Sequence, residues 1–278
     1  MSKFDLHLHS NYSDGSDDIN SLLEKVINSG IKIFALTDHD TVAGCNELAN
    51  TTPAGIKFIP GVELTCCSEG LNCHILGYYC DYNNPKLLNL IEKGKLLRRK
   101  KLDTRIQYLK DVHNITLTPE ETKWLYERTS VVKTHIANIL VNRGLANDNV
   151  SAMKKYLDDC KTGKTKFDIQ EAIDAINSSG GIPVWAHPLG GEGEIHDTQK
   201  DFLPKLEIMK KYGIKGLECY YSRYNEQETR FLIDCANANN LLISGGSDYH
   251  GTNKDIPIGR LNANDNYIDS NLVTLLNF

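Results

Sequence analysis

The chain alternates between short apolar runs and amphipathic segments. FDLHL, IKIFALT and IKFIPGVEL are apolar runs in its first quarter, and each is followed by polar residues. After the first run, apolar residues recur with helical spacing at Ile19, Leu22, Leu23, Val26 and Ile27. Ser16 is expected to cap this helix and Gly30 to end it. The pattern predicts strands that alternate with helices.

The same alternation fills the last part of the chain. FDIQEAIDAINSSGG, FLPKLEIMKKYG and EQETRFLIDCANANN read as helices, separated by the strand-like IPVWAHP, IKGLECYY and LLISGGSDYHG. With HILGYY as the fourth, seven strands are expected. Such alternation implies parallel strands joined by crossover helices, and this number favours a nearly closed barrel. We expect an α/β fold, a distorted (β/α)7 TIM-like barrel.

The segment between these halves reads as helices only. It includes KLLNLIEKGKLLRRKKLDTRIQYLKDV and PEETKWLYERTSVVKTHIANILVNRGL. We expect residues 1–84 and 167–278 to form the barrel domain and residues 85–166 an all-helical insertion that caps the substrate. Within it, Lys93 to Lys110 holds eight Lys or Arg residues. We favour a solvated helix face for this run, with an extended groove for an oligonucleotide as the alternative.

Composition is that of an ordinary globular chain: 278 residues, 40% hydrophobic and 24% charged. The net charge of −5 gives no overall attraction to long duplex nucleic acid. Without a signal-like N-terminus or an apolar run long enough for a membrane helix, a cytoplasmic location is expected, with neither a membrane nor an obligate protein partner. The eight cysteines show no CxxC spacing and are expected to be reduced, not metal ligands.

Histidines and carboxylates gather where the predicted strands end. His7 and His9 alternate with apolar residues, so both point to the same face of their strand. In a barrel of this kind, the strand ends and following loops form the active site. The candidate ligands there are His7, His9, Asp14, His39, Glu63, His74, His187, Asp248 and His250. This set is too large for one ion and predicts a cluster of two or three divalent metal ions.

Six motifs resemble those of the PHP (polymerase and histidinol phosphatase) metal-dependent phosphoesterases, in the same order: DLHLHSNYSDG, ALTDHDT, GVELT, HILGYY, WAHP and GGSDYHG. TSVVKTHIANILVNRGL and IPIGR resemble the branch with a helical insertion. That branch includes enzymes acting on nucleoside monophosphates, nucleoside 3',5'-bisphosphates and short RNA from the 5' end. The resemblance implies the PHP fold and a hydrolase of AMP, nucleoside 3',5'-bisphosphates or short oligonucleotides.

The resemblance also implies a distribution of ligands over three metal positions. The first would be held by His7, His9, Glu63 and Asp248. Glu63 would bridge to a second position, held also by His74 and His187. Asp14, His39 and His250 would hold the third, and Asp14 stands where other members have histidine. The ions expected are Mn, Fe or Zn, with Mg as an alternative that suits the harder Asp14 ligand.

Water shared between two such ions loses a proton near neutral pH, and the hydroxide attacks the phosphate ester. We expect Glu63, His187 and Asp248 to hold this hydroxide. Arg260 is either a bidentate phosphate ligand or a surface salt-bridge residue. Lys133 and His135, in the loop-like TSVVKTHI, are further candidates for substrate binding.

Four other residues lie near the predicted ligands. Asp5 and Asp38 either orient neighbouring histidines or serve as capping and turn residues. Glu218 and Tyr220 end the sixth strand and are assigned no role. Two alternative functions remain: a metal-dependent amidohydrolase-type enzyme, and a non-catalytic metal-binding module. The second predicts missing ligands, and none of the nine is missing from the sequence.

Overall fold

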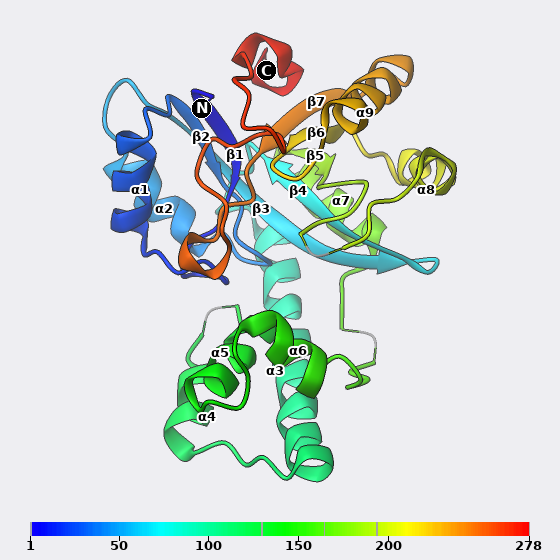
Figure 1. The fold of residues 1–278 in the computed structure, drawn as a ribbon. Coiled ribbons are helices and arrows are strands. Elements are labelled where there is room, and N and C mark those ends of the chain that lie inside the picture. Colours follow the sequence, from blue (N-terminus) through cyan, green and yellow to red (C-terminus); the bar gives the residue numbers. More distant parts are fainter. Residues whose placement is uncertain (1, 129, 164, 193, 278) are drawn as a thin grey trace.

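The barrel is a single sheet whose strands follow chain order. The computed structural model describes residues 2–128, 130–163, 165–192 and 194–277, and this part of the chain contains seven strands. They are β1 (Phe4–Leu8), β2 (Ile33–Leu36), β3 (Lys57–Ser68), β4 (Leu71–Tyr78), β5 (Ile182–Trp185), β6 (Gly216–Tyr221) and β7 (Leu242–Gly246). Just beyond β7, Asp248 N donates a hydrogen bond to His7 O at 2.9 Å. Together with the bridge between Leu8 and Tyr249, this bond nearly closes the barrel (Figure 1).

One strand runs against the others. β4 is antiparallel to both β3 and β5, whereas the remaining neighbours are parallel. The expectation of uniformly parallel strands was therefore wrong at β4. Glu69 and Gly70, with φ of 51° and 80°, make the tight turn between β3 and β4. Because β4 is reversed, its first half lies at the edge where the other strands end, which brings His74 to that edge opposite Thr65.

Helices pack around the sheet. They are α1 (Ile19–Asn28), α2 (Ala43–Thr51), α7 (Ile169–Ser178), α8 (Gln199–Tyr212) and α9 (Glu226–Ala238), followed by the short 3-10 turns Gly251–Asn253, Ser270–Leu272 and Thr274–Asn277. The side chain of Asp18 accepts Ser21 N and caps α1, so the prediction of Ser16 as its cap was wrong. Ser16 Oγ instead accepts Thr252 N at 2.9 Å and ties the loop after β1 to the loop after β7.

The insertion has a hydrophobic core of its own. α3 (Pro85–His113) leaves the barrel and extends into this lobe, where α4 (Pro119–Tyr126), α5 (Lys133–Asn142) and α6 (Asn149–Tyr156) pack against it (Figure 1). Its core includes Leu102, Leu109, Leu125, Ile136, Leu140 and Tyr156 and is separate from the barrel core. Lys133 and His135 lie in the first turn of α5, which corrects the loop-like interpretation of that segment. The domain boundaries at residues 85 and 166 stay a prediction.

Within the described ranges, no helix is both long and apolar enough to cross a membrane.

Candidate metal centre

Glu63 stands at the centre of the predicted ligands. β3 places its carboxylate, only 1% exposed, among side chains from the ends of β1 and β2. Glu63 Oε2 lies 3.3 Å from His7 Nε2, 3.2 Å from His9 Nε2 and 3.0 Å from His39 Nδ1. One carboxylate oxygen thus faces three imidazoles.

The other oxygen of Glu63 faces two more histidines. Oε1 lies 2.9 Å from His74 Nδ1 and 3.2 Å from His187 Nε2. His74 arrives from the reversed strand β4, and His187 follows β5. Both histidines line a cavity of about 500 Å³, so this side of the centre is open to a substrate.

Asp248 and Asp14 complete the cluster. Asp248 Oδ1 lies 3.5 Å from His7 Nε2 and 3.3 Å from His9 Nε2. Asp14 Oδ1 lies 3.1 Å from His250 Nε2, and Asp14 Oδ2 lies 3.8 Å from His39 Nε2. The loops after β1, β2 and β7 therefore meet at one place.

Three overlapping groups result, each with ligand atoms within 4.8 Å of one another: His7, His9, Glu63 and Asp248; His9, Asp14, His39 and His250; and His39, Glu63 and His74. The first has the four members that the family resemblance implies. The second contains the expected third set and adds His9. In the remaining group His39 joins Glu63 and His74, while His187 lies 3.2 Å from Glu63 but belongs to none of the three groups.

The centre passes a chemical test for metal binding. Four buried atoms of the centre have no hydrogen-bond partner in the part of the chain that the structure describes: the ring nitrogens His7 Nε2, His9 Nε2 and His39 Nδ1 and the oxygen Glu63 Oε2. Although they are close together, none is aligned as a hydrogen-bond pair. Leaving four such atoms unsatisfied is costly unless something else binds them. Imidazole nitrogen and carboxylate oxygen are ligands for zinc, iron and manganese, so the residues fit divalent ions.

The electrostatics keep the carboxylates ionised. Burial alone would raise the pKa of Glu63, but the neighbouring His39, His7 and His74 hold it well below the usual range. For Asp248, the effect of burial on the pKa is likewise outweighed by Lys254, His250 and His7. Both carboxylates are thus charged at neutral pH, the form in which they bind cations.

Comparison with known proteins places this centre in a family. A model described as "PHP domain" matches residues 5–172. The chain belongs to the PHP family. It is 32% identical over 253 residues to a protein of Haemophilus influenzae named "5'-3' exoribonuclease", covering 89% of this chain and 90% of that protein. It is 27% identical to the "3',5'-nucleoside bisphosphate phosphatase" of Chromobacterium violaceum, over 90% and 88% of the two chains.

A solved structure supports the same fold. An amidohydrolase of Chromobacterium violaceum, with bound sulfate and no metal, matches with a TM-score of 0.81 and 25% identity, over 92% of this chain and 90% of that chain. With the family membership and the relatives named above, the chain is a metal-dependent phosphoesterase of the PHP family.

Glu218 holds two histidines of the cluster around Glu63, which we call the PHP centre, although the sequence analysis assigned Glu218 no role. Its fully buried carboxylate comes from the middle of β6. Oε1 is 2.9 Å from His7 Nδ1, and Oε2 accepts the backbone N–H of His187 at 2.7 Å. A carboxylate bonded to the far nitrogen of a histidine ligand fixes the ring and its tautomer. The sequence placed Glu218 at the end of the sixth strand, whereas the structure places it inside β6, and only the packing identifies its partners.

Asp248 is held by two residues that were also missed. Tyr221 OH donates to Asp248 Oδ2 at 3.0 Å, and Lys254 Nζ donates to the same oxygen at 2.6 Å. Tyr220, which the sequence analysis placed at the end of the sixth strand without a role, makes no such contact within the described residues. Lys254 therefore brings a positive charge to the edge of the PHP centre.

Asp5 acts on backbone groups. It accepts the backbone N–H groups of His7, Ser247 and Gly259 at 3.2, 2.9 and 2.7 Å, which ties β1 to the segment after β7. These contacts fit the capping and turn interpretation of Asp5.

Asp38 fixes the loop after β1. It accepts Ser10 N at 2.8 Å, Ser10 Oγ at 2.6 Å and Ser13 Oγ at 2.5 Å. Ser13 Oγ in turn lies 3.5 Å from His9 Nδ1. Asp38 thus supports His9 indirectly, through Ser13.

The three substrate-binding candidates occupy different surroundings. Arg260 donates to the backbone oxygens of Asn262 and Ala263, and Lys133 forms an ion pair with Asp158. His135 is buried, and its Nδ1 accepts Val132 N at 3.1 Å.

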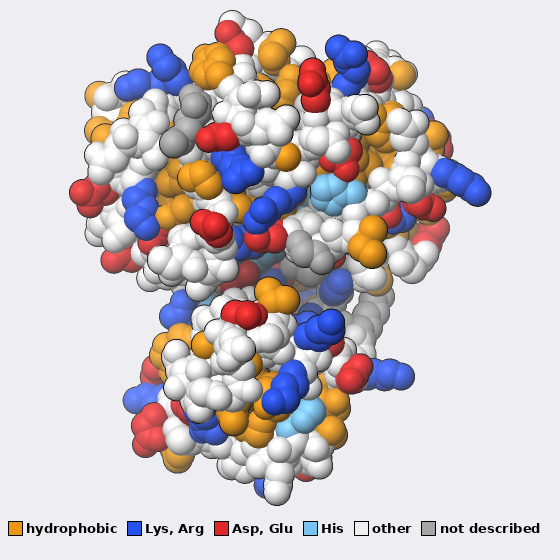
Figure 2. Space-filling view, in the orientation of Figure 1, with side chains coloured by type: hydrophobic (Ala, Val, Ile, Leu, Met, Phe, Trp, Pro, Cys, Tyr) orange, Lys and Arg blue, Asp and Glu red, His pale blue; other side chains and the backbone are white. Residues whose placement is uncertain are grey.

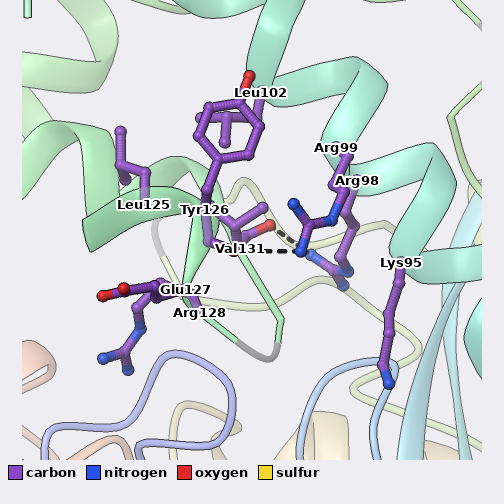
Figure 3. A pocket seen from close by; sticks show the side chains of 9 residues that line it. All are labelled: Lys95, Arg98, Arg99, Leu102, Leu125, Tyr126, Glu127, Arg128 and Val131. Carbon is purple, nitrogen blue, oxygen red and sulfur yellow. Dashed lines mark hydrogen bonds between the residues drawn. The ribbon is translucent and has the colours of Figure 1, made fainter. Parts of the chain in front are cut away.

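A hollow separates the barrel from the insertion, with Lys and Arg side chains on both sides (Figure 2). In the pocket of Figure 3, Arg98 and Arg99 of α3 face Tyr126 and Val131. Arg98 Nε donates to Asp40 Oδ2 at 2.7 Å, and Arg98 Nη1 donates to Val131 O. Asp40 directly follows the candidate ligand His39 in the chain. The insertion is therefore fastened to the edge of the PHP centre.

Proposed function

We propose that this protein hydrolyses phosphate esters of nucleotides or short oligonucleotides, including AMP and nucleoside 3',5'-bisphosphates. The observation that supports this most is the convergence around Glu63 of buried ligand atoms, unpaired within the described residues, beside an open cavity lined by His74 and His187. The two relatives named above act, by their names, on RNA ends and on nucleoside bisphosphates. Both substrates are phosphate esters of nucleotides.

We assign two or three divalent ions, of Mn, Fe or Zn with Mg as an alternative, to the three ligand groups. Bound there, they would acidify a water for attack on phosphorus and neutralise the phosphoryl oxygens. Glu63, His187 and Asp248 are the residues we assign to hold the attacking water. Glu218 holds the ring of His7 by its Nδ1, so that Nε2 faces the centre.

Arg260, Lys133 and His135 stay proposed substrate-binding residues. Arg260 uses only Nε and one terminal nitrogen for backbone oxygens, which leaves Nη1 as a donor. The carboxylate of Asp14 and the backbone of Ser13 both act to raise the pKa of His135, so its ring lies close to the loop after β1. The insertion therefore brings at least one polar group toward the PHP centre.

The test is product release by the Mn²⁺-loaded protein from AMP, from a nucleoside 3',5'-bisphosphate and from a 5'-phosphorylated trinucleotide. Inorganic phosphate and mononucleotide are measured separately, and His39→Ala is the control. Release that is lost in the control supports the proposal and ranks the substrates. No release from any substrate by metal-loaded protein would overturn it and favour the amidohydrolase or non-catalytic alternatives.

A further inference from the structure

Two cations on α3 have no partner in the part of the chain that the structure describes. The side chains of Lys101 and Arg105 are partly buried, and within the described residues neither forms a hydrogen bond or a close ion pair. Burial, together with the nearby charges of Arg105, Arg98 and Lys166, lowers the pKa of Lys101 to about 7. Buried like charges are unfavourable without a counter-ion, so this position is suited to an anion.

Several other cations of the same helix already have partners within the protein. Arg98 pairs with Asp40, and Arg99 Nη2 donates to Tyr126 O at 3.1 Å (Figure 3). Lys93 pairs with Glu171. These contacts fasten α3 to its surroundings, and they distinguish Lys101 and Arg105 from Lys93, Arg98 and Arg99. Lys100 and Lys110 differ in another way, because both are exposed.

Lys101 lines a second cavity, of about 490 Å³, between the insertion and the β3–β4 hairpin. Asn72 and Lys166 line both this cavity and the one that contains His74 and His187. Residues two apart on a strand point to the same face and lie about 7 Å apart, so Asn72 and His74 share one face of β4. The two cavities are therefore neighbours along the hairpin.

The acidic residues of the second cavity are engaged elsewhere. Glu69 Oε1 accepts Tyr212 OH at 3.0 Å. Asp168 caps α7 and accepts Ser68 Oγ at 2.6 Å. Lys166 Nζ donates to Asn72 Oδ1 at 2.9 Å, and an ammonium group has two further donors. Both lysines can thus still bind phosphate oxygens.

We propose that this second cavity binds a phosphate of a single-stranded oligonucleotide, beyond the nucleotide whose phosphate ester lies at the PHP centre. The inference rests on the proposed function and specifies its substrate. Lys101 and Lys166 hold the phosphate, and the partly exposed ring of Tyr212 provides a face for base stacking. The chain then prefers oligonucleotides over mononucleotides.

The test compares a 5'-phosphorylated pentanucleotide with AMP. Lys101→Met removes the charge and keeps the volume, and Lys100→Met, an exposed neighbour on the same helix, is the matched control. We expect Lys101→Met to raise KM for the pentanucleotide about 10-fold, with kcat for AMP unchanged. The slope of log(kcat/KM) against log[salt] should fall by about 1, because one phosphate contact is lost.

Lys166→Gln is a second variant, at another residue that lines the cavity. Fluorescence anisotropy of a labelled pentanucleotide measures binding without turnover. Weaker binding in both variants supports the subsite. If wild type turns over AMP while Lys101→Met and Lys166→Gln match it on the pentanucleotide, only the subsite is overturned. If wild type acts on neither substrate, the proposed function itself fails.

Discussion

At the scale of single residues, the side chains that hold the proposed ligands in place are as informative as the ligands themselves. Glu218 bonds both to the ring of His7 and to the backbone of His187, two residues of the PHP centre. Replacing the carboxylate by an amide would place an NH₂ group against one of these donors. The ring of His7 or the loop after β5 would then shift.

We predict that Glu218→Gln lowers metal affinity about 10- to 100-fold, the effect typical of losing a carboxylate behind a histidine ligand. Titration of metal into the metal-depleted protein, monitored by calorimetry, measures the change in affinity. Glu226→Gln, an exposed residue at the start of α9, is the control and should bind metal as wild type does. Equal metal affinities in the two variants would show that Glu218 does not support the PHP centre.

The convergence of the proposed ligand residues could be predicted from the sequence because parallel strands end at one edge of a barrel. Glu218 and Tyr221 could not be assigned in the same way. The register between β6 and β7 shifts between Glu218 and Tyr220, so Tyr221, not Tyr220, reaches Asp248. Such a bulge changes which side chains share a face, and its position depends on packing between strands rather than on local sequence.

At the scale of elements, a buried ion pair between Arg98 and Asp40 fastens α3 to the loop after β2. Arg98 and Asp40 are 11% and 6% exposed, and Arg98 also reaches Thr65 Oγ1 at 3.3 Å. Breaking a buried pair from one side leaves an uncompensated charge.

Arg98→Ala should therefore lower the free energy of unfolding by about 3 kcal/mol, measured by urea denaturation. Arg99→Ala, on the exposed side of α3, should change it by less than about 0.5 kcal/mol. Similar losses in the two variants would contradict the role of Arg98 as the fastening between the lobes.

His135 makes the insertion sensitive to acid. Burial, with Arg128 nearby, lowers its pKa to about 4 from 6.5. Between pH 6.5 and about pH 4 the unfolded chain therefore binds a proton that the folded chain does not. The free energy of unfolding falls over this range by up to about 1.4 kcal/mol for each unit that the pH is lowered. His135→Gln, which does not titrate, should show a smaller loss between pH 7 and pH 5 in urea unfolding. A parallel pH dependence in both proteins would refute this assignment.

The reversed strand β4 had a signal in the sequence that the overall alternation of strands and helices concealed. Glu69-Gly70 is a two-residue connection between apolar runs, and its positive φ angles are those of a hairpin turn. A crossover helix needs many more residues than this. The short connection alone therefore indicates an antiparallel pair.

At the scale of the whole molecule, the barrel depends on a close approach between its first and last strands. A Cβ added at Gly246 would lie 2.2 Å from the Cβ of His7, a distance that packed atoms do not adopt. The barrel and its insertion could be predicted from the order of apolar runs. This closure could not, because nothing local distinguishes Gly246 from its neighbour Gly245.

Gly246→Ala is predicted to separate β7 from β1 and displace His7, lowering both the melting temperature and metal content. Ile243→Val on the same strand is the control and should cost only about 1 kcal/mol. Differential scanning calorimetry and elemental analysis of the purified proteins measure the two effects. A Gly246→Ala protein with wild-type metal content would show that the contact is unimportant for the centre.

The position of Glu63 has a consequence for how the protein acquires its ions. Its two oxygens face five imidazoles, so a single side chain serves two of the three ligand groups. An ion bound by one oxygen would hold this carboxylate with its other oxygen facing the next ligand group. We therefore predict that the proposed ion sites load cooperatively: at limiting metal the population would divide into empty and fully loaded molecules, and activity would follow the fraction of complete clusters.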